Sequence, residues 1–169
     1  MTIAPTADEI FEMAEQIERN GARFYQRAAQ GFTDSRARQV LLDLAAMEDE
    51  HEKVFAAVRA DLLQQEREPR VPDPYGEAIL YVRGMADGHV FDVKADPAKR
   101  LTGKETPEDI LTTAIGLEKD SIAFYLGMKE FVPQRFGRDR LDGIIKEEMG
   151  HIAILSKDLR SLKEEQGPR

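Results

Sequence analysis

Apolar residues recur at alternating intervals of three and four positions along four stretches of the chain. In the first stretch these residues are Ile10, Ala14, Ile17, Gly21, Phe24 and Ala28. Side chains at this spacing lie on one face of an α-helix, so the pattern predicts amphipathic helices. The predicted helices span Thr6 to Gly31, Asp34 to Glu68, Thr106 to Val132 and Gly137 to Glu165. The chain is therefore expected to be all-α.

The chain contains an internal repeat with an offset of 100 positions. The segment from Ile17 to Tyr25 corresponds to Leu117 to Tyr125, and Glu48 to His51 corresponds to Glu148 to His151. Each copy extends over two predicted helices, so one helical hairpin present twice is the simplest explanation. We expect the two hairpins to form an antiparallel four-helix bundle, with residues 1–169 as a single domain.

The two copies also begin in the same way. Thr6 is followed three positions later by Glu9, and Thr106 is followed by Pro107 and then by Asp109. Threonine before a first turn that contains acidic residues is typical of a helix N-cap, and proline is favoured at the first helical position. Both threonines are therefore predicted to cap helices.

The hairpins are expected at about residues 6–68 and 106–165. The crossover between them, about residues 69–105, is long for a loop without secondary structure. Apolar residues at roughly helical spacing occur within it from Tyr75 to Val90. We therefore expect a short extra helix in the crossover.

Six ionisable residues interrupt the apolar faces of the four predicted helices. They are Glu18, Glu48, His51, Glu118, Glu148 and His151. Other polar residues of the first helix fall on the opposite face, which should be exposed: Asp8, Glu12, Glu15, Arg19 and Gln26. An unpaired buried carboxylate costs several kcal/mol, so glutamates that converge in a core require compensating cations.

The types and spacing of these six residues predict a site for two metal ions. Two divalent cations neutralise four glutamates, and a Glu-x-x-His motif places a carboxylate and an imidazole one turn apart on one helix face. Carboxylate-rich ligation with one imidazole per metal suits iron or manganese, and zinc also binds such ligands. The absence of cysteine excludes thiolate and iron–sulfur sites. We expect two iron ions per chain, with manganese or zinc as alternatives.

Four residues near the predicted ligands have expected supporting roles. Tyr25 and Tyr125 lie two turns beyond the inward glutamates of their own helices, so each hydroxyl can donate a hydrogen bond to a ligand carboxylate. Packing in the core accounts for the tyrosines equally well. Met47 and Met149 adjoin the ligands in sequence and are expected to fill the core.

The charge and hydropathy of the chain limit its expected partners. The formal net charge is -8, and no cluster of Lys and Arg is present, so we expect no nucleic-acid binding. No stretch approaches the roughly 20 apolar residues that cross a bilayer. The segment from Met1 to Pro5 also lacks the features of a secretory signal. We therefore expect no membrane association and a cytoplasmic location.

These motifs resemble the rubrerythrin branch of the ferritin-like superfamily, and the resemblance covers both hairpins. It rests on an inward Glu followed by Phe-Tyr and on a Glu-x-x-His motif in each copy. The resemblance implies that the metal ligands are Glu18, Glu48, His51, Glu118, Glu148 and His151. It also implies reduction of peroxide or dioxygen at a di-iron centre.

The sequence departs from that family in two respects. Rubrerythrins proper carry a rubredoxin domain with a four-cysteine iron site, and this chain has no cysteine, so we expect an external electron donor. They also carry a further Glu one turn after the ligand of the third helix. Ser121 occupies that place here and is a candidate neighbour of the metals.

Two other functions remain open on the sequence alone. The same six ligands occur in ferroxidase centres of the bacterioferritin kind, so iron oxidation and sequestration is one alternative. The other is a metal-free helical interaction protein, in which Glu48 with His51 and Glu148 with His151 are salt-bridged pairs in the core. We expect a homo-oligomer, whose size the sequence does not define.

Overall fold

The computed structural model describes residues 6–62, 101–129 and 138–166, together with isolated residues of the intervening segment. Its helices are α1 (Ala7–Ala29), α2 (Ser35–Ala60), α4 (Pro107–Met128) and α5 (Arg138–Gln166). The described ranges contain no β-strand. The predicted all-α fold with four long helices is confirmed.

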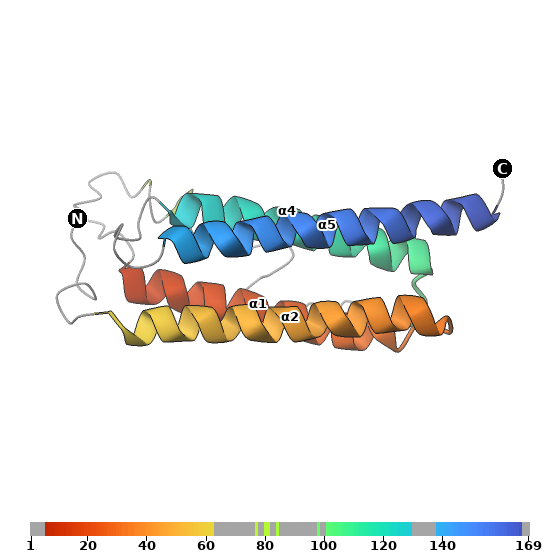
Figure 1. Ribbon diagram of the computed structural model, residues 1–169, viewed down its shortest axis with the longest axis horizontal. Coiled ribbons are helices and arrows are strands. Elements are labelled where there is room, and N and C mark those ends of the chain that lie inside the picture. Colours follow the sequence, from red (N-terminus) through yellow and green to blue (C-terminus); the bar gives the residue numbers. More distant parts are fainter. Residues whose placement is uncertain are drawn as a thin grey trace.

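The helices form two hairpins that pack side by side. Helix α1 packs on α2 and α4 packs on α5, and the hairpins meet through α1 with α4 and α2 with α5. In Figure 1 the hairpin of α1 and α2 forms one layer, and the hairpin of α4 and α5 forms the other. Each helix runs antiparallel to both of its neighbours. The side chains of all four helices can therefore converge on one central axis.

The predicted helix N-caps are confirmed in both copies of the hairpin. The Thr6 hydroxyl accepts the backbone N–H of Glu9 at 3.1 Å, and the Thr106 hydroxyl accepts that of Asp109 at 3.1 Å. In each case the acidic side chain accepts the backbone N–H of the threonine, which completes a capping box. A cap of this kind stabilises a helix by about 1 kcal/mol.

Helix α2 ends earlier than its apolar pattern predicts. The prediction extended this helix to Glu68, whereas α2 ends at Ala60. The N–H of Leu62 bonds to the carbonyl of Arg59 at 3.2 Å, a tighter i to i−3 contact that closes the last turn. The sequence has no Gly or Pro between Ala60 and Pro69, so it contains no local signal for this end.

Most of the predicted crossover helix lies outside the described residues. Of the segment from Tyr75 to Val90, only Glu77, Leu80, Tyr81 and Gly84 are described, and all of these are helical. The bounds of the extra helix therefore stay predictions. The third helix is predicted to end at Val132, whereas α4 ends at Met128 with Lys129 as its C-cap.

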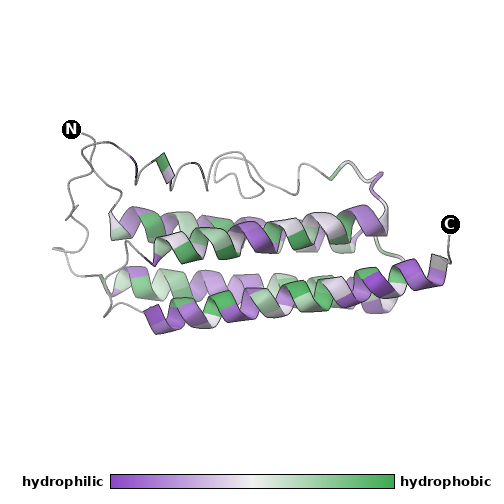
Figure 2. Ribbon diagram, turned by 90° about the horizontal axis from the view of Figure 1, so that it is seen from above, coloured by the Kyte–Doolittle hydropathy of each residue, from purple (hydrophilic) through white to green (hydrophobic). Residues whose placement is uncertain are grey.

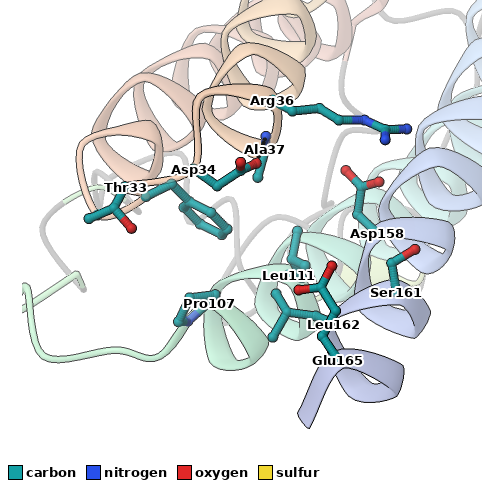
Figure 3. A pocket seen from close by; sticks show the side chains of 12 residues that line it. Thr33, Asp34, Arg36, Ala37, Pro107, Leu111, Asp158, Ser161, Leu162 and Glu165 are labelled. Atoms are coloured by element: carbon teal, nitrogen blue, oxygen red, sulfur yellow. Dashed lines mark hydrogen bonds between the residues drawn. The ribbon is translucent and has the colours of Figure 1, made fainter.

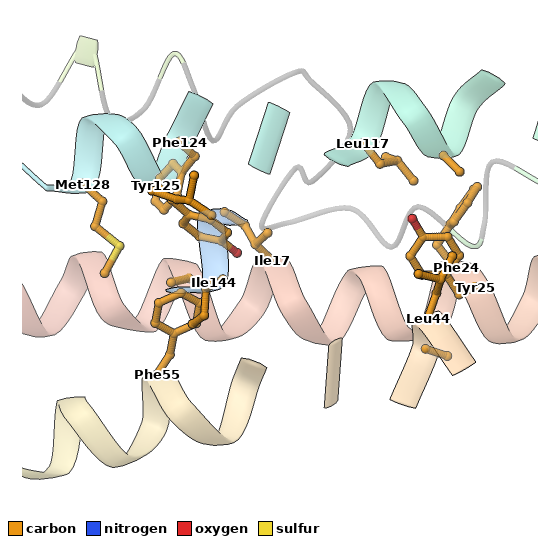
Figure 4. Close-up of a cluster of buried hydrophobic side chains, with 14 of the residues drawn as sticks. Ile17, Phe24, Tyr25, Leu44, Phe55, Leu117, Phe124, Tyr125, Met128 and Ile144 are labelled. Carbon is orange, nitrogen blue, oxygen red and sulfur yellow. The ribbon is translucent and has the colours of Figure 1, made fainter. Parts of the chain in front are cut away.

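The core consists of the predicted apolar faces, interrupted by the polar cluster. One group of buried rings contains Phe24 and Tyr25, whose ring centroids are 5.6 Å apart. A second group contains Phe55 and Tyr125, 5.2 Å apart, with Phe11 packed on Phe55. In Figure 4 the hydroxyls of the two tyrosines point from these groups toward the stretch between them. Apolar layers thus lie on both sides of the predicted ligands.

Three predictions about side-chain exposure are wrong. Glu15 was assigned to the exposed face of α1, but it is buried because Arg19 and Arg59 both form ion pairs with it. Met47 and Met149 were assigned to the core, but they are 36% and 59% exposed. Met47 directly precedes the inward Glu48 and Met149 directly follows the inward Glu148, so the helical rotation turns both side chains outward.

The polar faces of the helices remain on the outside of the bundle. Figure 2 shows hydrophobic and hydrophilic residues alternating along each helix, as expected for amphipathic helices. Among the described residues, no helix combines the length and the apolar character needed to span a bilayer.

Candidate metal centre

The structure brings the six predicted ligands together in the middle of the bundle. All are at most 4% exposed: Glu18, Glu48, His51, Glu118, Glu148 and His151. Each helix contributes at least one of them, because the inward positions of the four helices lie at the same level. The two Glu-x-x-His motifs face each other from α2 and α5, with the imidazole rings 5.7 Å apart and nearly parallel at 16°.

The six residues form two overlapping groups, in each of which the ligand atoms lie within 4.8 Å of one another. The first ligand group is Glu18, Glu48, His51 and Glu148. The second ligand group is Glu48, Glu118, Glu148 and His151. Two glutamates, one from α2 and one from α5, belong to both groups. If two metal ions bind, Glu48 and Glu148 would therefore contribute to both, while the other residues would serve one ion each.

Both histidines point Nδ1 into the cluster. In the first group, His51 Nδ1 lies 3.2 Å from a Glu148 oxygen and 3.5 Å from a Glu18 oxygen. In the second group, His151 Nδ1 lies 2.9 Å from the other Glu148 oxygen and 3.4 Å from an oxygen of Glu118. If metals bind, Nδ1 is thus the ring nitrogen available to them.

Several buried polar atoms that face into the cluster have no hydrogen-bond partner among the described residues. They are Oε2 of Glu18, Oε1 of Glu48, both carboxylate oxygens of Glu148, and Nδ1 of His51 and His151. Their short separations do not have hydrogen-bond geometry, so the atoms are gathered around common points without satisfying one another. Buried polar groups are almost always paired, and unpaired ones are costly. Cations at these points would satisfy all of these atoms, so the residues present fit a pair of metal ions.

The two predicted tyrosines hold carboxylates across the bundle. Tyr25 on α1 donates its hydroxyl to Oε1 of Glu118 on α4, and Tyr125 on α4 donates to Oε1 of Glu18 on α1. Each tyrosine thus supports the glutamate of the other hairpin, because the two helices are antiparallel. The Ser121 hydroxyl instead donates to its own helix, at the carbonyl of Leu117, 3.2 Å away.

One contact to the cluster comes from a residue that the sequence analysis did not select. The carboxylate of Glu147 lies 2.8 Å from His51 Nε2, on the side of the ring that faces away from the cluster. Its side chain is 55% exposed and lies on the polar side of α5. A charged residue is expected on such a face, so the sequence pattern does not mark Glu147 as part of a site. The contact forms because α2 and α5 pack against each other, which the sequence pattern alone does not show.

Without metal, protons take the place of cations in the cluster. Burial and nearby carboxylates raise the pKa of Glu48 well above its usual value, and burial raises the pKa of Glu118 to about 8. Burial alone would lower the histidine pKa values, but the neighbouring glutamates outweigh it and raise the pKa of His51 to about 11 and that of His151 to about 9. The imidazolium groups then lower the pKa of Glu148 to about 2, although burial opposes this. Metal binding must displace these protons.

Two surface hollows differ in their relation to the cluster. A cleft of about 610 Å³ between α2 and α5 is lined by His51, Glu147 and Ile144 and reaches the edge of the cluster. A second cavity of about 460 Å³ lies at the end of the bundle where α1 turns into α2, and Figure 3 shows Arg36 and Asp158 among its lining residues. The cluster residues do not line this second cavity.

Comparison with known proteins supports the fold. The chain matches no protein-family model, and no curated protein is significantly similar to it. It is similar to a crystal structure of a protein from Thermotoga maritima with the provisional name "ferritin-like diiron-carboxylate protein". The TM-score is 0.73 at 21% sequence identity, and the match covers 96% of this chain and 100% of the other. The four-helix bundle is therefore a ferritin-like fold, as predicted.

Proposed function

We propose that this protein is a di-iron carboxylate oxidoreductase of the rubrerythrin type, which reduces peroxide or dioxygen with electrons from an external donor. The observation that carries the proposal is the set of unpaired, buried carboxylate and imidazole atoms at the centre of the bundle. A metal-free core would pair or exclude such groups. This observation argues against a metal-free interaction protein.

The six residues could hold two metal ions. Glu18 and His51 would serve one ion and Glu118 and His151 the other, while Glu48 and Glu148 would contribute to both. When bound, two iron(II) ions would supply one electron each, and these two electrons with two protons reduce one hydrogen peroxide to two molecules of water. Carboxylates can change between one and two bound oxygens, so the glutamates can adapt as the charge of the centre changes.

The surrounding residues favour this chemistry over uncontrolled reaction with solvent. The ring groups around Tyr25 and Tyr125 cover the cluster along the bundle axis and limit access of bulk water. The tyrosine hydroxyls fix the orientation of two carboxylates. The cleft between α2 and α5 offers a route for a small oxidant to the edge of the cluster.

An external donor is part of the proposal because the chain has no cysteine and thus no rubredoxin-type iron site of its own. The donor must return two electrons after each oxidation. Without it, oxidation should stop after a single turnover.

A matched pair of variants on α2 tests the proposal. Glu48 is buried and belongs to both ligand groups, whereas the Glu50 side chain is 70% exposed and pairs with Lys53. Glutamine matches glutamate in size and adds no charge to the buried cluster, and burial raises the pKa of Glu48, which already disfavours its charged form, so Glu48→Gln should preserve the fold. Peroxide consumption is measured without oxygen, on iron-loaded protein with an artificial reductant. We expect the wild type and Glu50→Gln to be active and Glu48→Gln to lose at least about 100-fold, the upper end for loss of metal-site residues.

Two results would refute this function. One is a wild type that retains iron but does not consume peroxide or dioxygen faster than free iron does. The other is equal activity of the two glutamine variants, which would place the chemistry away from the cluster. Circular dichroism and thermal melting of each variant confirm that the fold is retained.

A further inference from the structure

The two halves of the cluster differ outside the ligands themselves. Nε2 of His51 faces the Glu147 carboxylate at 2.8 Å, whereas Nε2 of His151 is buried and has no hydrogen-bond partner among the described residues. The repeat offset of 100 explains the difference, because the residue that corresponds to Glu147 is Met47. A thioether is only a weak acceptor. One histidine therefore has a carboxylate partner, and its counterpart lacks one.

A carboxylate on the outer nitrogen of a histidine changes how its inner nitrogen binds metal. With Glu147 as acceptor, the proton of neutral His51 is held on Nε2, so Nδ1 presents its lone pair to the first ligand group. The contact also fixes the ring orientation and raises its basicity, and losing such a partner costs about 10- to 100-fold in metal affinity. In His151, no acceptor among the described residues holds the proton on Nε2, so its tautomer is not fixed in this way.

We propose that Glu147 is a positioning residue for His51 and that it makes the two metal positions unequal, so that the first ligand group fills before the second. This inference rests on the proposed function, because it assumes that the cluster binds metal. It assigns the difference to a pair of residues, Glu147 and Met47, that lie outside the ligand set.

The placement of Glu147 makes the inference testable without disturbing the core. Its side chain is 55% exposed at the mouth of the cleft between α2 and α5, so its replacement leaves no buried gap. Met47 is 36% exposed, so a glutamate is tolerated there as well. Glu50 lines the same cleft and is 70% exposed, which makes Glu50→Leu a matched control.

The experiment uses cobalt(II) as the probe and the full chain as the protein. Crystals are grown with one equivalent of cobalt(II), and the occupancy of each metal position is measured by anomalous scattering. When one equivalent is shared between two positions, the occupancy ratio is the square root of the affinity ratio, so in the wild type we expect the first ligand group to hold about 3 to 10 times more cobalt than the second. Glu147→Leu should bring this ratio to about 1, Glu147→Gln should restore part of it because the amide oxygen still accepts, and Glu50→Leu should leave it unchanged.

Met47→Glu provides the converse test. A carboxylate at this position should supply the partner that His151 lacks and raise the occupancy of the second ligand group toward that of the first. Equal occupancy in the wild type, or an unchanged ratio in Glu147→Leu, would overturn the inference and leave the proposed function standing. A wild type with no cobalt at either position would overturn both.

Discussion

Replacing Tyr125 with phenylalanine removes a single hydroxyl from the boundary of the cluster. The hydroxyl donates to Glu18 from the opposite hairpin, and both side chains are at most 1% exposed. The ring itself packs on Phe55 at 5.2 Å and stays in place in the variant. The perturbation is therefore one hydrogen bond, with no loss of apolar packing.

The magnitude follows from two independent considerations. A hydrogen bond to a charged acceptor contributes about 1.5–3 kcal/mol, and no other donor to this Glu18 oxygen is present among the described residues. Loss of a residue that orients a metal ligand lowers metal affinity by about 10- to 100-fold, which is about 1.4–2.7 kcal/mol. The two ranges agree. Because Glu18 belongs only to the first ligand group, we expect this weakening there and little change at the second.

The assay is competition for cobalt(II) between the protein and a chelator, with the occupancy of each position determined by anomalous scattering. Tyr25→Phe should show the reverse pattern, because Tyr25 supports Glu118 in the second ligand group. Tyr81→Phe, at a tyrosine that is 47% exposed, is the control. If Tyr125→Phe weakens both positions equally, or neither, the reasoning about cross-hairpin support is wrong.

Two further predictions concern pH and turnover. The pKa of His151 is raised from 6.5 to about 9, so its stabilising charge is fully present below pH 6.5 and is lost as the pH rises through 9. The pKa of Glu118 is raised to about 8, so its ionisation also opposes folding as the pH rises. The Tm of metal-free protein should therefore fall between pH 6.5 and 9, whereas that of metal-loaded protein should not; a flat or rising metal-free Tm contradicts this. Finally, Ser121→Glu should speed peroxide turnover with a donor, by restoring the carboxylate of the resembled family, and a slower or inert variant would refute this.

The fold and the six clustered residues could be predicted because each one leaves a local mark in the sequence. Glu18 and Glu118 stand out as charges within apolar helical faces, and the repeat pairs each with a counterpart. Thr6 and Thr106 mark helix starts through chemistry confined to a single turn. Such signals depend on neighbours in the chain, so no tertiary information is needed.

Other features depend on contacts between helices and could not be found in this way. Glu147 lies on a polar face, and only the pairing of α2 with α5 brings it to His51. Glu15 is buried by Arg59 of α2, a partner distant in sequence. The sequence indicates the tyrosines as candidate neighbours of the ligands, but their bonds to the opposite hairpin follow from the antiparallel packing of α1 and α4.

The central claim is that the cluster exists to bind two metal ions, and counting bound iron tests it most directly. Protein purified without chelator is loaded with iron(II) in the absence of oxygen, freed of excess metal, and assayed for iron and protein. We expect two iron ions per chain, one for each ligand group. Iron at the background level, or no more than Glu48→Gln retains after the same treatment, would contradict it.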